Sequence, residues 1–192
     1  MSDQPLIVGI GGTPHPGSST ERALALALDV ARQRGMRTRL FGGEALSALP
    51  FYAYGCVGGS PVAEDFVAAL READGVVIAS PGYHGSISGL VKNALDYVEE
   101  TARDARPYLD GLPVGLIVTA YGWQATGSTL GTLRSIVHAL RGWPTPFGAG
   151  IKSVPGLFVD GVCQDDQIRG QIEMVSDQVV EFARRGGAVA VS

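Results

Sequence analysis

Small and hydroxyl-bearing residues fill two loops of this 192-residue chain, and each loop follows an apolar run and precedes a helical pattern. The first, residues 11–20, ends in three successive hydroxyl residues: Ser18, Ser19 and Thr20. The second, residues 80–89, holds three glycines, three serines and a proline around Tyr83 and His84. Small residues let a backbone approach a flat ligand, and aromatic side chains can cover it. The two loops therefore predict that main-chain groups recognise a ligand.

Hydroxyl residues at the start of a helix have two interpretations. They can cap the orphan N–H groups of the helix, or they can bind a phosphate together with those groups, because the helix dipole favours an anion there by roughly 0.3–1 kcal/mol. Three hydroxyls after a glycine favour the phosphate. Gly12 and Gly17 have Walker A spacing but no lysine follows, and Pro14 stands where a dinucleotide fingerprint needs its third glycine. A lone monophosphate fits this loop better than a triphosphate or a dinucleotide.

The chain resembles the NADPH-dependent FMN reductase family of flavodoxin-like proteins over almost its whole length. The matching residues lie in both loops: Gly12-Thr13 and Pro16 to Thr20 in the first, then Pro81, Tyr83, Gly85-Ser86, Ser88-Gly89 and Lys92 to Asp96. The second group is the specific part of the resemblance. The sequence departs from the family at His15, where the family often has arginine, and at His84, where it often has asparagine.

The resemblance implies FMN as the cofactor and NADPH or NADH as the hydride donor. It places the FMN phosphate at the first loop: Thr13, His15, Ser18, Ser19 and Thr20. The isoalloxazine ring would run along the second loop: Pro81, Gly82, Tyr83, His84, Gly85 and Ser86. A third loop, residues 119–124, would border the ring through Thr119, Tyr121, Gly122 and Trp123. Tyr83, His84 and Trp123 are the candidates for shaping the nicotinamide site. No catalytic side chain and no metal ligand is assigned.

The expected activity is hydride transfer from the nicotinamide to FMN, in which the cofactor carries the electronic work. Reduced flavin would then serve a partner flavin-dependent monooxygenase or a small acceptor. The alternative is an FMN-bound oxidoreductase that reduces a specific quinone-like or other organic substrate, and a flavodoxin-like electron carrier is the third interpretation. The motif at residues 83–96 disfavours the carrier, as does the modest acidity, because carriers commonly dock through an acidic face.

Composition is that of an ordinary soluble globular protein, with 45% hydrophobic and 18% charged residues. The net charge of −4 provides no electrostatic footprint for nucleic acid or an anionic membrane. Cys56 and Cys163 lie far apart, which implies neither a disulfide framework nor a zinc site. No signal peptide is visible, and no apolar run approaches the roughly 20 residues that span a bilayer. We therefore expect one cytoplasmic domain over residues 1–192, and a homodimer or homotetramer because the family usually associates through the helix after the second loop.

The elements that must position these loops follow from hydrophobic periodicity. Apolar runs predict five strands, at residues 6–10, 36–41, 75–79, 114–119 and 147–151. Helical patterns separate or follow them, at about 19–34, 61–73, 88–102, 128–141 and 164–185. Alternating strands and helices predict an α/β flavodoxin-like three-layer sandwich with a five-stranded parallel sheet of order 2-1-3-4-5. The ligand site would lie at the switch between the first and third strands.

Two segments are predicted to be irregular. Residues 42–60 carry Phe51, Tyr52 and Tyr54 among glycines, and long irregular segments tend to be functional or mobile. Their aromatic side chains would cover a flavin, line a partner subunit or, the favoured interpretation, pack against the protein's own surface. Residues 143–146 are expected to form a rigid connector before the fifth strand, with the Trp143 indole filling the edge of the core.

Overall fold

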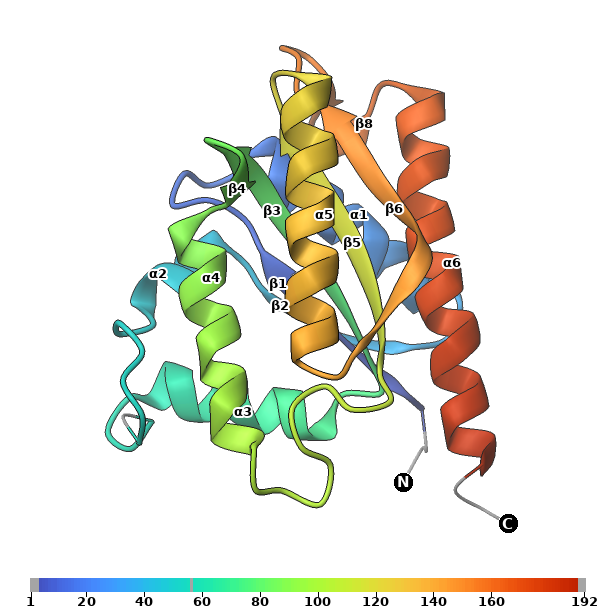
Figure 1. Ribbon diagram of the computed structural model, residues 1–192. Helices are drawn as coiled ribbons and strands as arrows, with labels where there is room; N and C mark the ends of the chain where they lie inside the picture. Colours follow the sequence, from blue (N-terminus) through green and yellow to red (C-terminus); the bar gives the residue numbers. More distant parts are fainter. Residues whose placement is uncertain (1–3, 56, 190–192) are drawn as a thin grey trace.

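Five parallel strands form the central sheet of the computed structural model, which describes residues 4–55 and 57–189. The expectations for Cys56 and for residues 1–3 lie outside the described residues. The strands are β1 (Leu6–Gly11), β2 (Arg37–Phe41), β3 (Gly75–Tyr83), β5 (Pro113–Ala120) and β6 (Trp143–Lys152). Their order is β2-β1-β3-β5-β6 (Figure 1), which confirms the predicted flavodoxin-like order.

Helices cover both faces of this sheet (Figure 1). On one face lie α1 (Ser19–Gln33) and α6 (Asp166–Val189). On the other lie α2 (Gly43–Ala48), α3 (Pro61–Glu72), α4 (Gly89–Asp96), the 3-10 helix η1 (Tyr97–Thr101) and α5 (Trp123–Ala139). Successive side chains of a strand point to opposite faces, so Val8 enters one core while Ile7 enters the other. The continuous apolar runs of the sequence thus supply two cores, and the three-layer sandwich is confirmed.

Glycine in a central strand lets α6 lie close to the sheet. A Cβ atom built on Gly115 would lie 2.7 Å from Val175 Cγ1 and 2.8 Å from Val179 Cγ2. Both valines are buried in the core beneath α6 and are stiff at χ1, so they have little room to withdraw. The glycine is therefore a packing requirement of this face.

Helix α5 begins at Trp123, five residues before the predicted start at residue 128. The side chains of its first turns that point into the protein are those of Thr126 and Thr129, and both are buried. Because threonine is not counted as apolar, the early part of the helix lacks the periodicity from which a helix is predicted. The predicted third loop is shortened in consequence, since Trp123 already belongs to the helix.

Strand β6 includes residues 143–146, so the prediction of a connector there is wrong. Proline cannot donate to a sheet, but β6 is an edge strand, where proline is tolerated. The carbonyl groups of Thr145 and Pro146 each accept a hydrogen bond from Arg134 of α5, at 2.9 Å. Trp143 is 70% exposed, which also corrects its expected place at the edge of the core.

The segment predicted to be irregular contains the short helix α2, whose six residues are too few to show a helical period. Its neighbour Tyr52 packs edge to face on Tyr97, with ring centroids 5.1 Å apart. The Tyr52 N–H also donates to Asn93 Oδ1 at 2.8 Å. Phe51, by contrast, is 91% exposed, and Tyr54 is exposed as well. Packing on the protein's own surface is therefore correct for Tyr52 and not for its two aromatic neighbours.

Two short hairpins complete the fold: β4 (Ser86–Ile87) pairs with the end of β3, and β7 (Phe158–Val159) pairs with β8 (Val162–Cys163). Both pairings are antiparallel, and the apolar runs of the sequence predicted neither. They lie at the upper end of the sheet in Figure 1, where the parallel strands end. Among the described helices, none has both the length and the apolar character needed to cross a membrane.

Candidate functional site at the carboxyl edge of the sheet

Three loops leave the same edge of the sheet from neighbouring strands. Gly11, at the end of β1, pairs with Ala79 of β3, and Pro81 of β3 pairs with Thr119 of β5. Because β1, β3 and β5 are parallel, the segments that follow them begin side by side. The chain crosses from β1 to β2 on one side and to β3 on the other, so this edge is the topological switch point where ligands bind in such folds. The structure therefore brings the predicted site residues to one edge.

The loop after β1 is held tightly against its neighbours. Gly11 and Gly12 have φ values of 153° and 126°. A Cβ atom on Gly11 would lie 2.0 Å from the Ala79 carbonyl oxygen, so only glycine fits there. A Cβ atom on Gly43, at the start of α2, would lie 1.8 Å from the Thr13 carbonyl oxygen. The start of the loop, at residues 11–13, is thus packed against the sheet on one side and against α2 on the other.

Some hydroxyl groups of this loop make hydrogen bonds within the loop or cap α1, and others are unbonded among the described residues. Ser18 is the N-cap of α1, and its Oγ accepts from the Glu21 N–H at 3.3 Å, so the capping interpretation holds for Ser18. Thr13 Oγ1 accepts from the His15 N–H within the loop, at 3.3 Å, and the His15 side chain is exposed. Within the described chain, the Ser19 hydroxyl and the Ser19 backbone N–H have no hydrogen-bond partner. The phosphate role of these residues stays a prediction.

Thr20 and Thr119 meet below the loop. Their hydroxyl oxygens are 2.6 Å apart and buried, and the bond joins the first turn of α1 to the end of β5. Two residues that the sequence assigned to different parts of the site are therefore in direct contact. Their contact with a ligand remains a prediction.

The second loop is a hairpin rather than an irregular loop. Gly82 pairs with Ile87 and Tyr83 with Ser86, which leaves His84 and Gly85 as a two-residue turn. Their φ values are 50° and 86°, and positive φ at both central residues is typical of the type I′ turn that suits the twist of a hairpin. The sequence hid this hairpin because β4 is only two residues long.

Hydrogen bonds fix the hairpin to the rest of the fold. Ser80 Oγ accepts from the Ser88 N–H at 3.0 Å and donates to the Pro81 carbonyl oxygen at 2.9 Å. Ser88 in turn caps α4, and Thr129 Oγ1 of α5 donates to the Ser86 carbonyl oxygen at 3.4 Å. The hairpin is therefore tied at its base and to α5.

Exposed aromatic side chains surround this edge. Tyr121 is 87% exposed in the loop after β5, and Trp123 and Tyr83 are exposed on α5 and the hairpin. Gly122, the N-cap of α5, has no side chain to bond the first N–H groups of that helix. Flat, exposed rings next to free backbone donors fit a flat, partly polar ligand.

Two charged residues beside the first loop, Glu21 and Arg22, were not among the predicted site residues. Glu21 Oε2 is buried without a partner in the described part of the chain, and a Cβ atom on Gly42 would lie 2.7 Å from Glu21 Oε1. Arg22 Nη1 donates to the Phe158 carbonyl oxygen at 2.7 Å. The available signal was the position of Arg22 four residues after Ser18, because helix side chains lean toward the helix N-terminus.

Lys92, Asn93 and Asp96, which belong to the specific part of the resemblance, have structural roles on α4. Lys92 and Asp96 form an exposed i,i+4 ion pair at 2.5 Å. Asn93 Nδ2 donates to the Pro50 carbonyl oxygen at 3.0 Å, in addition to the bond it accepts from Tyr52. These contacts hold the segment after α2 against α4.

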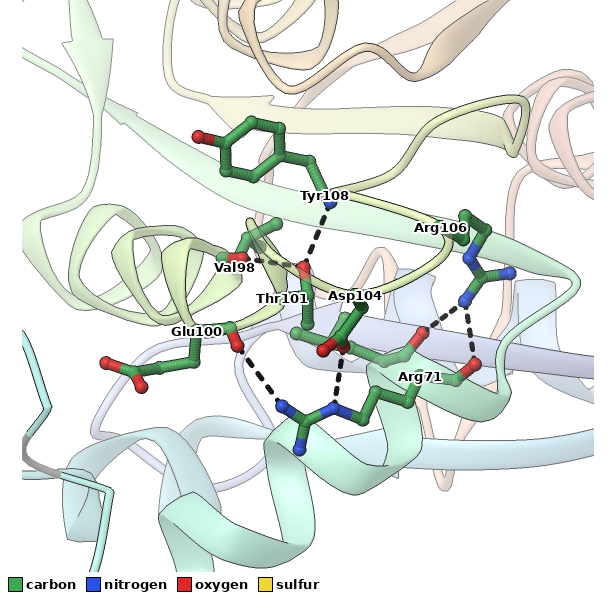
Figure 2. A network of polar contacts seen from close by, with 8 residues as sticks. Arg71, Val98, Glu100, Thr101, Asp104, Arg106 and Tyr108 are labelled. Atoms are coloured by element: carbon green, nitrogen blue, oxygen red, sulfur yellow. Dashed lines mark hydrogen bonds and ion pairs between the residues drawn. The ribbon is translucent and has the colours of Figure 1, made fainter.

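Two hollows in the described surface lie away from the carboxyl edge. One, of about 400 Å³, is lined by the end of α3 and residues 101–108. Arg106 is one of its lining residues, and Arg106 Nη2 donates to the carbonyl oxygens of Leu70 and Arg71 at 2.6 and 2.9 Å. Figure 2 shows Arg106 next to Arg71. Burial lowers the pKa of the Arg106 guanidinium below its ordinary value, while Asp74 and Asp104 oppose this shift. The second hollow, of about 530 Å³, lies between the start of β6 and α6.

The donors at the carboxyl edge fit a phosphate. Small residues leave room beside the backbone, the N-terminus of α1 favours an anion, and Ser19 offers an unbonded hydroxyl and N–H. Arg22 adds a permanent positive charge nearby. Among the described residues, no group of three or more histidine, cysteine, aspartate or glutamate side chains could hold a metal ion.

Comparison with known proteins identifies relatives with related activities. A family model described as NADPH-dependent FMN reductase matches residues 5–151. The FMN-dependent NADPH-azoreductase of Staphylococcus haemolyticus is 35% identical over 122 residues, which are 62% of this chain and 61% of that protein. An NAD(P)H-dependent FMN reductase of Pseudomonas aeruginosa is 30% identical over 141 residues, which are 72% of this chain and 69% of that protein. The match thus spans about three fifths of the azoreductase.

Solved structures share the fold at lower identity. FerB, an NAD(P)H:(acceptor) oxidoreductase from Paracoccus denitrificans, has a TM-score of 0.74 and is 18% identical, with 94% of this chain and 98% of FerB covered. An apo NADH:FMN oxidoreductase has a TM-score of 0.72 and is 22% identical, with 95% of this chain and 90% of that chain covered. Both structures support the same three-layer arrangement.

Proposed function

The chain belongs to the NADPH-dependent FMN reductase family, and from this premise we propose that it binds FMN and transfers hydride to it from NADPH or NADH. The observation that carries the proposal is the meeting of three segments at one edge. The loop after β1, the β3–β4 hairpin and the start of α5 follow adjacent parallel strands, and the matched family region includes all three. In a doubly wound sheet this is where a mononucleotide is held.

Each segment has a separate task in this proposal. The loop at residues 12–18 and the first turn of α1 bind the phosphate through hydroxyl and backbone N–H groups. The hairpin, which is fixed by Ser80 and Ser88, holds the flat ring in one orientation. Tyr83, Tyr121 and Trp123 cover the site with exposed rings and so limit access of water.

When bound, FMN supplies the chemistry, because its ring accepts the hydride that a reduced nicotinamide donates. The protein has to hold the isoalloxazine ring and the nicotinamide ring against each other and to maintain the geometry of the site. No side chain is required to move a proton in this step. Tyr83, His84 and Trp123 are proposed to shape the nicotinamide site, since they come from the hairpin and from α5 at the same edge.

A second candidate is an enzyme that keeps FMN bound and reduces an aromatic acceptor such as an azo compound or a quinone. The exposed rings of Tyr83, Tyr121 and Trp123 favour it, because stacking on them suits a flat apolar acceptor. The Staphylococcus relative is named an azoreductase. In this case the acceptor would take the place of the oxidised nicotinamide at the same edge.

Three further expectations from the sequence and from the resemblance are also proposed. They are a homodimer or homotetramer, a cytoplasmic location and a flavin-dependent monooxygenase that consumes reduced FMN. Size-exclusion chromatography with light scattering tests the first directly, since a monomer would contradict it.

The experiment that tests the proposed function begins with the visible absorption spectrum of the purified protein. FMN is titrated in, and NADPH or NADH is then added under anaerobic conditions. We expect bound flavin that bleaches on addition of a reduced nicotinamide. A flavin spectrum present before titration indicates a retained cofactor, and binding only after titration indicates an exchangeable substrate.

Steady-state assays with free FMN, an azo dye and a quinone separate the candidates. Turnover of free FMN supports the reductase, and faster turnover of the dye or quinone by protein with retained FMN supports the second candidate. Flavin that binds but is not reduced by either nicotinamide would contradict both and favour an electron carrier.

A further inference from the structure

Arg22 lies beside the first loop although it belongs to α1. A Cβ atom built on Gly17 would lie 3.2 Å from Arg22 Nη2 and 3.5 Å from Arg22 Nε, so the guanidinium passes along the backbone of the loop. The side chain reaches it because helical side chains lean toward the N-terminus of their helix. Nη1 is fixed by its bond to the Phe158 carbonyl oxygen, at 2.7 Å. The guanidinium is therefore held between the loop and the β7–β8 hairpin.

In the described part of the chain, this guanidinium has no ion-pair partner. No carboxylate in the described chain forms an ion pair with Arg22, and the neighbouring Glu21 is turned toward Gly42 instead. The N-terminal end of a helix carries a partial positive charge, so a cation there is unfavourable unless an anion is near. Arg22 is also half-buried, which increases the unfavourable effect of the unpaired charge. The structure thus places a permanent cation where a bound anion would compensate it.

We propose that Arg22 is the side chain that binds the phosphate of FMN through its charge. The proposal rests on the proposed function, which places that phosphate at residues 12–18. It assigns to Arg22 the part that the resemblance gives to an arginine at position 15, where this chain has His15, which carries no permanent charge. Nη2 and Nε, which lie on the Gly17 side, remain as donors, because only Nη1 is bonded to Phe158. Charge-assisted bonds from guanidinium to phosphate are among the strong hydrogen bonds of proteins.

Riboflavin provides the comparison that isolates this contact, because it has the ring and ribityl chain of FMN but no phosphate. The dissociation constants of both flavins are measured by quenching of flavin fluorescence, for the wild type and for Arg22→Gln. Glutamine removes the charge and keeps an amide donor at the chain position of Arg22 Nε. We expect Arg22→Gln to raise the dissociation constant of FMN about tenfold and to leave that of riboflavin unchanged.

Arg32→Gln is the matched control. It removes the same charge from the last turn of the same helix, where Arg32 is exposed and pairs with Asp29. We expect its affinity for both flavins to equal that of the wild type. A second measurement uses the unmodified protein: the Nε–H resonance of Arg22, identified by its loss in Arg22→Lys, should shift with FMN and not with riboflavin.

The outcomes distinguish this inference from the proposed function. If Arg22→Gln binds FMN as tightly as the wild type, or weakens both flavins equally, Arg22 only tethers the β7–β8 hairpin and the inference is wrong. If the Arg22 Nε–H resonance of the wild type does not shift when FMN is added, the inference is also wrong, and this holds even where Arg22→Gln fails to fold. If the wild type binds neither flavin, the proposed function fails, and the inference fails with it.

Discussion

Two buried hydroxyl groups, those of Thr20 and Thr119, are bonded only 2.6 Å apart beneath the first loop. At the scale of single residues this pair joins α1 to β5, the two elements that flank the site. The neighbouring serines of the loop differ in their contacts. The Ser18 hydroxyl caps α1, while the Ser19 hydroxyl is unbonded among the described residues. Adjacent residues of one type thus have different roles, and only their contacts distinguish them.

The threonine pair gives a double-mutant prediction. Thr20→Val and Thr119→Val should each lower the free energy of unfolding by about 1–3 kcal/mol, because each leaves one buried hydroxyl unsatisfied. The double variant removes both polar groups with little change of shape, so it should be far more stable than the sum of the two losses implies. Urea unfolding of the four proteins measures this. Strictly additive losses would contradict the importance of the bond.

At the scale of elements, the β3–β4 hairpin depends on its turn. His84 and Gly85 both have positive φ, and a Cβ atom on Gly85 would meet nothing within 4 Å. The glycine is therefore required by the backbone conformation of the turn and not by close packing of protein around it. Asparagine followed by glycine is the preferred sequence for such a turn.

The turn predicts opposite outcomes for two substitutions. His84→Asn should preserve the hairpin, whereas Gly85→Ala should destabilise it by about 1–2 kcal/mol because an L side chain is strained at positive φ. Hydrogen exchange of the hairpin amides measures the difference, which corresponds to roughly tenfold faster opening in Gly85→Ala. Equal protection in both variants would show that the contacts of Ser80 and Thr129 hold the hairpin without help from the turn.

The end of α3 depends on Arg106. This guanidinium donates to three carbonyl groups at the helix C-terminus, those of Leu70, Arg71 and Ala73. Figure 2 shows the bond to Arg71. Arg106→Met should lower the free energy of unfolding by about 2–3 kcal/mol, because the carbonyl groups lose a charged donor. Arg103→Met, at an exposed position three residues earlier, should change it by no more than about 0.5 kcal/mol. Chemical denaturation compares them, and equal effects would rule out a specific role for Arg106.

At the scale of the whole molecule, stability comes from two cores on opposite faces of one sheet. Helix α6 completes one of them by packing on β5 at Gly115. The candidate site, by contrast, consists of segments at one edge of that sheet, where substitutions of exposed residues leave both cores intact. Changes in the cores should therefore affect unfolding, while changes of exposed groups at the edge affect binding.

The same substitution at two glycines should shift stability in opposite directions. Gly115→Ala should lower the free energy of unfolding by about 1–3 kcal/mol, since its Cβ overlaps Val175 and Val179. Gly131→Ala, in the exposed middle of α5 with nothing within 4 Å, should raise it by about 0.5–1 kcal/mol. Thermal unfolding should show a lower midpoint for the first and a higher one for the second. A raised midpoint for Gly115→Ala would mean that α6 does not pack as described.

The sequence by itself determined the five strands of the central sheet, most of the helices and their order, because hydrophobic periodicity is local and parallel strands joined by helices permit few arrangements. It also located the first two loops, since small residues directly after apolar runs mark the carboxyl ends of strands. The resemblance carried by those loops indicated the family.

Only the tertiary structure decided how the site is built. Thr20 meets Thr119 across 99 positions of sequence, and Arg22 meets Phe158 across 136. The β3–β4 hairpin and the proline-containing start of β6 likewise depend on bonds from α5, through Thr129 and Arg134. Periodicity reports which face of an element is apolar, but not which polar groups from distant elements will meet. Those contacts form when the layers pack. They distinguish a capping hydroxyl from an unbonded one, and a fully solvated arginine from Arg22, which lies along the first loop.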